Sequence, residues 1–262
     1  MELDLSARTA LVCGSTQGIG RACARQLAAQ GAHIVIMARD EEKLKEEVLE
    51  LNAINGLRND YLLADFSDYK AVKEAVELYL QSRNAIHILV NNNGGPPAGK
   101  ITEAEPEAFF SAFTQHLICN QVITQTVLEG MINSDYGRII NIISTSVKAP
   151  LHGLGVSNTI RASVANWAKT LANEVGKYGI TVNNVLPGAT KTGRLEQIIR
   201  NKAERTSQSL EDVEGEMLQE IPLDRFALPE EIANAVGFLA SPAAAYITGI
   251  NLPVDGGRTA SL

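Results

Sequence analysis

A glycine-rich stretch near the start of the sequence has the residue types and spacing of a phosphate-binding turn. Gly14, Gly18 and Gly20 come directly after a short apolar run, Thr9–Cys13, and before a helix-forming run, Arg21–Gln30. Glycines let the backbone approach a pyrophosphate closely, and the free N–H groups at a helix start attract an anion. The spacing G-x-x-x-G-x-G differs from the commoner dinucleotide pattern G-x-G-x-x-G. The stretch predicts a nucleotide site; the alternative is a turn that only packs a helix on a strand.

Polar or glycine-rich residues also follow other apolar, strand-like runs. They are Arg39, Asp65, the run Asn91–Gly94, Ser144 and the run Pro187–Thr192. In a parallel sheet, ligands bind beyond the carboxyl ends of the strands. We therefore expect these residues to gather at one edge of a sheet and to form one site.

The elements that must position these residues alternate between strand and helix patterns. The predicted strands are Thr9–Cys13, Ala32–Ala38, Asp60–Ala64, Ala85–Val90, Gly137–Ile143, Thr181–Leu186 and Ile247–Val254. The predicted helices are Arg21–Gln30, Glu41–Leu51, Asp68–Ser82, Pro106–Phe113, Thr114–Ile132, Ser157–Lys177 and Pro229–Ala240. This order predicts an α/β fold: a single Rossmann-like domain over residues 1–262, with a doubly wound parallel sheet of about seven strands and helices on both faces. The charged, helix-leaning segment 193–220 is predicted to be a substrate lid.

Composition excludes several classes of protein. The chain has 262 residues, and 23 basic against 30 acidic residues give a net charge of −7, which argues against a nucleic-acid-binding surface. Cys13, Cys23 and Cys119 form no disulfide framework. No signal pattern or membrane-spanning apolar run is present. We expect a cytoplasmic protein that binds neither membrane nor nucleic acid and holds no metal.

Several motifs together resemble the short-chain dehydrogenase/reductase family, from about Leu5 to Gly257. The glycine motif of that family appears as Cys13–Gly20, its N-N-A-G as Asn91–Gly94, its P-G-x-x-x-T as Pro187–Thr192, and its C-terminal pattern as Arg225–Gly257. The resemblance implies hydride transfer between a nicotinamide cofactor and a carbonyl or alcohol carbon. The expected cofactor-binding residues are Gly14, Ser15, Thr16, Gln17, Gly18, Ile19, Gly20, Arg39, Asp65, Phe66, Asn92, Asn93, Gly94, Arg161, Pro187, Gly188, Thr190 and Thr192.

The catalytic positions depart from the family pattern. The family serine falls on Ser144, but Ser157 stands in place of the tyrosine, Arg161 in place of the lysine, and His116 in place of the asparagine. A divergent branch of the family carries a similar S-N-x-x-R. Arg161 keeps a positive charge and hydrogen-bond donors, so it can hold the cofactor ribose. Among Ser157, Arg161 and His116, only the imidazole has an unperturbed pKa, about 6.5, that suits proton transfer.

The roles of these residues have alternatives. Ser144 could only end its strand, Ser157 could only cap its helix, Arg161 could be a solvated or ion-paired side chain, and His116 could be a histidine of the core. Lys148 and His152 are further candidates for the proton donor. The alternatives to an oxidoreductase are a non-catalytic dinucleotide-binding protein and, less favoured, a lyase or dehydratase.

Two further expectations concern the cofactor and the assembly. Arg39 follows the second strand and can bind the 2′-phosphate of NADP(H), so we predict preference for NADP(H) over NAD(H); Asp40 opposes this preference. The helices Thr114–Ile132 and Ser157–Lys177 are apolar on more than one face. This favours a homo-oligomer, which the family resemblance predicts to be a tetramer.

Overall fold

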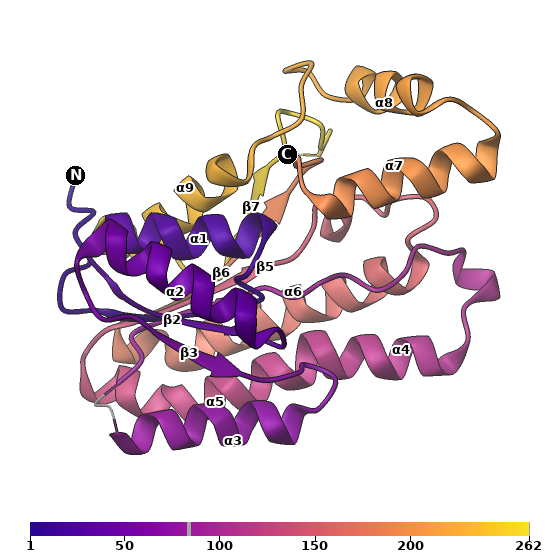
Figure 1. Ribbon diagram of the computed structural model, residues 1–262. Coiled ribbons are helices and arrows are strands. Elements are labelled where there is room, and N and C mark those ends of the chain that lie inside the picture. Colours follow the sequence, from indigo (N-terminus) through magenta and orange to yellow (C-terminus); the bar gives the residue numbers. More distant parts are fainter. Residues whose placement is uncertain (83–84, 262) are drawn as a thin grey trace.

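One sheet of seven parallel strands forms the centre of the computed structural model, which describes residues 1–82 and 85–261 (Figure 1). The strand order is β3-β2-β1-β4-β5-β6-β7, so the direction of winding reverses between β1 and β4. This reversal opens a crevice at the carboxyl ends of these two strands. The strands are β1 (Thr9–Cys13), β2 (His33–Ala38), β3 (Asp60–Leu63), β4 (Ile88–Asn91), β5 (Gly137–Ile142), β6 (Ile180–Pro187) and β7 (Asn251–Val254).

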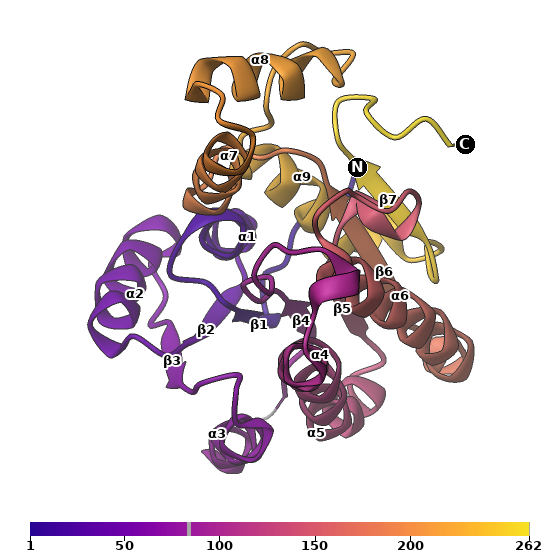
Figure 2. The ribbon, with the colours of Figure 1, turned by 90° about the vertical axis from the view of Figure 1, so that its right-hand side faces the viewer.

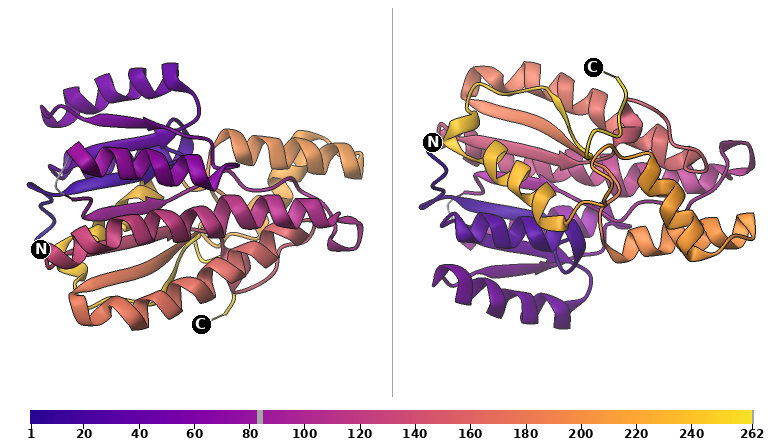
Figure 3. Two further views of the ribbon diagram at one scale, coloured as in Figure 1. Left: turned by 90° about the horizontal axis from the view of Figure 1, so that it is seen from below. Right: turned by 90° about the horizontal axis from the view of Figure 1, so that it is seen from above.

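Helices cover both faces of the sheet (Figures 2 and 3). One face carries α1 (Gly18–Ala29), α2 (Glu41–Asn55) and α9 (Pro229–Ala240). The other carries α3 (Tyr69–Ser82), α5 (Cys119–Asn133) and α6 (Gly155–Val175), with α4 (Pro106–Phe113) continuing into α5. The helices α7 (Gly193–Thr206) and α8 (Leu210–Gln219) project beyond the carboxyl edge of the sheet.

The alternation of side chains along the strands explains the two cores. In β1, Ala10 and Val12 pack toward α1 and α9, whereas Leu11 and Cys13 pack toward α3 and α5. Strands covered on both faces must be apolar at every position, and β1, β2, β4 and β5 are buried almost throughout. The predicted doubly wound α/β fold is therefore confirmed.

A row of asparagines crosses the sheet near the carboxyl ends of β4 and β5. Asn91, Asn141, Asn184 and Asn251 stand in register on β4, β5, β6 and β7. Each amide nitrogen donates to the next amide oxygen at 2.8–2.9 Å. Asn91, Asn141 and Asn184 are buried and Asn251 is exposed, so these bonds pair most of the amide groups that would otherwise be costly in the core; the Oδ1 of Asn91 has no partner in the described chain. The row lies directly beneath the loops that follow β4 and β5.

Several elements have other bounds than the sequence predicts: α1 begins at Gly18 and not at Arg21, α2 ends at Asn55 and not at Leu51, and β4 begins at Ile88 and not at Ala85. The last strand begins at Asn251, not at Ile247, because Gly249 takes a left-handed turn with φ of +71°. The predicted helix Thr114–Ile132 contains a π-helical turn at Thr114–Ile118, which the apolar pattern does not reveal. The long helix α6 begins at Gly155, two residues before the predicted start.

Candidate active site

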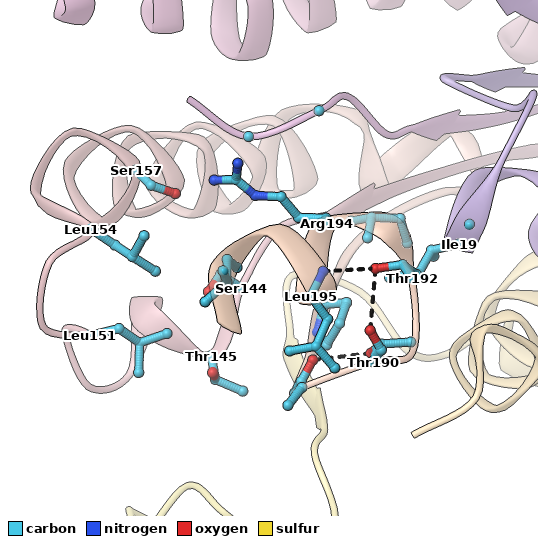
Figure 4. Close-up of a pocket in the computed structure, with 18 of the residues that line it drawn as sticks. Ile19, Ser144, Thr145, Leu151, Leu154, Ser157, Thr190, Thr192, Arg194 and Leu195 are labelled. Atoms are coloured by element: carbon cyan, nitrogen blue, oxygen red, sulfur yellow. Dashed lines mark hydrogen bonds between the residues drawn. The ribbon is translucent and has the colours of Figure 1, made fainter. Parts of the chain in front are cut away.

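A cleft of about 990 Å³ lies at the carboxyl ends of β1, β4, β5 and β6. The glycine turn, the loop after β4, the loop between β5 and α6, the run Pro187–Thr192 and helix α7 form its walls. Figure 4 shows how residues of α6 and α7 face each other across it. The structure thus brings the polar strand ends together at one edge. Of the predicted residues, those that line the cleft are Gly14, Gln17, Gly18, Ile19, Asn92, Asn93, Gly94, Ser144, Ser157, Arg161, Pro187, Gly188, Thr190 and Thr192.

The glycine turn leaves the start of α1 open to the cleft. A Cβ atom on Gly14 would lie 2.3 Å from the backbone oxygen of Asn92, and one on Gly20 would lie 2.2 Å from the oxygen of Gly14. The Asn92 side chain donates to that same Gly14 oxygen at 3.1 Å, which fixes the turn against β4. Gln17, the residue before the helix, makes no capping bond, so the first N–H groups of α1 remain available to an anion. These features fit the pyrophosphate of a dinucleotide.

Ser144 ends β5 and also caps the short turn 145–147. Its Oγ accepts a hydrogen bond from the Ser146 N–H at 3.0 Å. This bond fixes the oxygen, while the hydroxyl proton has no acceptor among residues 1–82 and 85–261. The hydroxyl can therefore donate to an oxygen atom of a molecule bound in the cleft.

Ser157 and Arg161 lie one turn apart on α6. The helix starts at Gly155, so Ser157 is not its cap, and its hydroxyl has no partner in the described chain. Arg161 is only 8% exposed and donates to the backbone oxygens of Ile142, at 3.1 Å, and Asn93, at 3.5 Å. Burial, and then the charge of Arg194, lowers the pKa of Arg161 to about 10, so the guanidinium stays charged at neutral pH.

His116 lies behind the wall of the cleft, in the π-helical turn. The side chain is buried, and its Nε2 has no hydrogen-bond partner in the described part of the chain. Burial, followed by the charge of Arg161, holds the pKa of His116 well below 6.5, although a bond with the backbone of Gly94 opposes this. The imidazole is therefore neutral at neutral pH. Asn93 joins this turn to the cleft by donating to the Gln115 oxygen at 2.7 Å.

The other predicted cofactor residues do not line the cleft. Ser15 is fully buried, and Gly20 packs against the turn itself. Arg39 is exposed at the end of β2, where its charge helps to lower the pKa of Asp65, after the hydrogen bonds from Ser67. The remaining residues outside the lining are Thr16 and Phe66.

Sequence reasoning missed several residues that line the cleft. Leu151 and Leu154 give the cleft an apolar wall. The side-chain amide of Asn158 holds Leu151 in place by binding the backbone N–H and C=O of Leu151. The lining residues on α7 are Gly193, Arg194, Leu195, Ile198, Asn201, Lys202 and Arg205. Most of these are three, four or seven residues apart, which places them on one helical face. This spacing in the sequence of the predicted lid could have indicated that these residues share one face of a helix.

Comparisons with known proteins agree with this geometry. The family model described as Enoyl-(Acyl carrier protein) reductase matches residues 14–259. The 3-oxoacyl-(acyl-carrier-protein) reductase of Pseudomonas aeruginosa is 34% identical over 257 residues, which cover 97% of this chain and 98% of that protein. This chain belongs to the short-chain dehydrogenase/reductase family. Its homologues are NAD(P)-dependent enzymes that act on carbonyl or alcohol groups, and the chain is an oxidoreductase of this type.

Solved structures of this family superpose along the whole chain. The L-sorbose reductase of Gluconobacter frateurii, in complex with NADPH and L-sorbose, is 31% identical with a TM-score of 0.94, and the match covers 100% of both chains. YwfH, an NADPH-dependent reductase involved in bacilysin biosynthesis, is 28% identical with a TM-score of 0.92, and the match covers 98% of this chain and 100% of YwfH. In the described part of our chain, no helix is long and apolar enough to cross a membrane.

Proposed function

We propose that this oxidoreductase reduces a carbonyl group of a small molecule with NADPH in a site that works without the usual tyrosine and lysine. The observation that supports this proposal most strongly is the meeting of the open glycine turn, the Ser144 hydroxyl and the Arg161 guanidinium in one cleft. When bound, the nicotinamide supplies a hydride. The residues of the chain then have to bind the cofactor, orient the substrate and deliver a proton to the carbonyl oxygen.

Ser144 and Arg161 take separate tasks in this proposal. Ser144 donates a hydrogen bond from its free hydroxyl to the carbonyl oxygen and stabilises the negative charge that develops there, while the proton itself comes from another group. Arg161 holds the nicotinamide ribose with guanidinium N–H groups that its two backbone bonds leave available. Ser157 is too weak an acid to replace a phenol. Its side chain is also smaller than that of tyrosine, so it leaves room for a water molecule. His152 also lines the cleft and is a candidate source of the proton.

Preference for NADP(H) has support at the end of β2. Arg39 is exposed and available to a 2′-phosphate. Asp40 accepts the Lys43 N–H at 3.2 Å and forms an ion pair with the Lys43 ammonium at 3.0 Å. Because Asp40 caps α2 and is already paired, its repulsion of a phosphate is reduced.

Three further assignments belong to the same proposal. Helices α7 and α8 form a lid over the substrate. They pack on each other through their own apolar cluster, and α7 forms one wall of the cleft. The protein assembles as a homotetramer; Phe110 and Phe113 of α4 are exposed apolar side chains available for such contacts. Sedimentation at micromolar concentration tests the assembly, and a monomer would contradict it. The free, buried cysteines are those expected of a cytoplasmic protein.

The double variant Ser157→Tyr with Arg161→Lys tests whether the present residues are a working alternative. NADPH oxidation is followed with a panel of carbonyl compounds for the natural protein and the variant. We expect the natural protein to turn over at least one carbonyl and the variant to lose that activity. A gain of reduction in the variant alone would instead show a disabled reductase. NADPH binding without turnover in the natural protein would favour a non-catalytic binding protein.

A further inference from the structure

The lining of the cleft is strongly basic although the chain as a whole is acidic. Eight Arg and Lys side chains line it, against only Glu220 and Glu230. Some of the basic residues are already neutralised, because Arg21 and Arg25 bind Glu47, Lys202 binds Glu216 and Arg258 binds Glu220. Arg161 and Arg194 have no carboxylate within 4.0 Å among the residues that the structure describes. Lys191 and Arg205 also line the cleft without a carboxylate within that distance in the described chain. Of these four cations only Arg161 is buried, and Arg194 is the one whose charge acts on it.

Arg161 and Arg194 approach the same small space from opposite walls. The position that a Cβ atom on Gly95 would occupy lies 3.6 Å from one Nη2 of Arg194 and 3.7 Å from one Nη2 of Arg161. Arg194 is held there by its bond to the Pro96 oxygen, at 2.7 Å, and its guanidinium points from α7 toward Ser157 on α6 (Figure 4). Two like charges that both lie within 4 Å of one position repel each other, and burial of Arg161 strengthens the repulsion. An anion between them would remove this cost and gain charge-assisted hydrogen bonds.

We propose that the space between Arg161 and Arg194 binds a carboxylate, and that the substrate is an oxo acid whose carboxylate sits there while its apolar part meets Leu151 and Leu154. Helix α7 supports this arrangement. Its apolar side, with Ile199 and Ala203, packs against α8, which turns the side bearing Arg194 into the cleft. Assignment of the anion to the substrate rests on the proposed reduction; the anion site itself does not.

The first experiment compares acids with their neutral esters. The probes are 2-, 4- and 5-oxohexanoate and their methyl esters, with NADPH at saturation and kcat/KM as the readout. We expect the natural protein to prefer at least one acid over its ester by about tenfold or more, the size of one or two charge-assisted bonds. In Arg194→Gln this acid-to-ester ratio should fall about tenfold. Arg200→Gln is the matched control, because Arg200 is exposed on the same helix and does not line the cleft.

Two results of this experiment would overturn the proposal. One is an acid-to-ester ratio near one in the natural protein, or an unchanged ratio in Arg194→Gln. The other is a loss of NADPH affinity in Arg194→Gln by the same factor as the loss of acid preference. That loss would mean that the pair binds a phosphate of the cofactor.

The second experiment needs no turnover and places a carboxylate in the site. Gly95 has no left-handed φ, and the nearest atoms to a Cβ there are the two guanidinium nitrogens, so a side chain fits. We expect Gly95→Asp to melt about 2 °C or more above the neutral, isosteric Gly95→Asn, because the aspartate pairs with the arginines. The NADP⁺-saturated natural protein should be stabilised by an oxohexanoate and not by its ester, and Gly95→Asp should lose this response.

The two experiments separate the carboxylate site from the proposed reduction. Stabilisation by the acids without turnover would keep the carboxylate site and contradict the reductase. Turnover of the esters with no response to the acids, together with equal melting of Gly95→Asp and Gly95→Asn, would contradict the site and keep the reductase.

Discussion

Replacement of Asn141 by leucine tests whether the row of asparagines holds the floor of the active site. Asn141 lies near the carboxyl end of β5 and is fully buried. Its amide accepts from Asn91 at 2.9 Å and donates to Asn184 at 2.8 Å. Leucine is similar in size, so the change removes both bonds without opening a large cavity.

The expected loss of stability follows from the groups that the change leaves unpaired. The Nδ2 of Asn91 and the Oδ1 of Asn184 lose their partners, and water cannot reach them because both residues are about 97% buried. Each unsatisfied buried group costs about 1–3 kcal/mol, so the free energy of unfolding should fall by about 2–6 kcal/mol. For a chain of this length, each kcal/mol lowers the melting temperature by about 2–4 °C.

Urea denaturation at a fixed protein concentration measures this loss, because assembly would make the stability depend on concentration. Asn166→Leu is the control, since Asn166 is exposed on α6. Asn91 also precedes Asn92, whose side chain fixes the glycine turn. We therefore expect weaker NADPH binding in Asn141→Leu as well. A free energy of unfolding within 0.5 kcal/mol of the natural value, on the order of a neutral surface change, would refute the reasoning.

The remaining predictions concern the site. Ser144→Ala should lower turnover about tenfold or more at unchanged NADPH affinity, because it removes the hydroxyl proposed to meet the carbonyl oxygen. Steady-state kinetics with a saturating cofactor checks this. Arg39→Ala should weaken NADPH binding more than NADH binding, and equal losses in a fluorescence titration would count against the assigned phosphate contact. Because the pKa of His116 is lowered in the folded protein, the imidazole takes up a proton at a higher pH in the unfolded chain than in the folded one. The contribution of neutral His116 to the free energy of unfolding is therefore complete above about pH 6.5 and is lost as the pH falls below that value. The free energy of unfolding of His116→Gln should therefore fall less between pH 7 and pH 5 than that of the natural protein. If His116 also relays the proton, the turnover of this variant should drop about 100-fold.

Local patterns predicted much of the fold and of the cofactor site. The glycine turn and the loop after β4 could be predicted because a phosphate-binding turn requires particular residues at fixed spacing in one segment. The asparagine row was not readable, because Asn91, Asn141 and Asn184 lie on different strands and meet only through the register of the sheet. The π-helical turn was missed for a related reason. It inserts one residue into a continuous apolar helix and alters the direction of His116 without changing the composition.

The burial of Arg161 indicates whether a site that lacks the family tyrosine and lysine still binds a ligand. A guanidinium at 8% exposure, with no carboxylate beside it in the described chain and a second guanidinium nearby, is costly for the folded protein. An apolar residue of similar volume would often be neutral or stabilising at such a place. A site without a ligand would lose such an arginine easily, since most proteins have little stability to spare. The arginine is instead held by two backbone oxygens and faced by Arg194, which is itself bonded to Pro96. An arrangement with this cost and this support is best explained by an anion that binds there and offsets the charge.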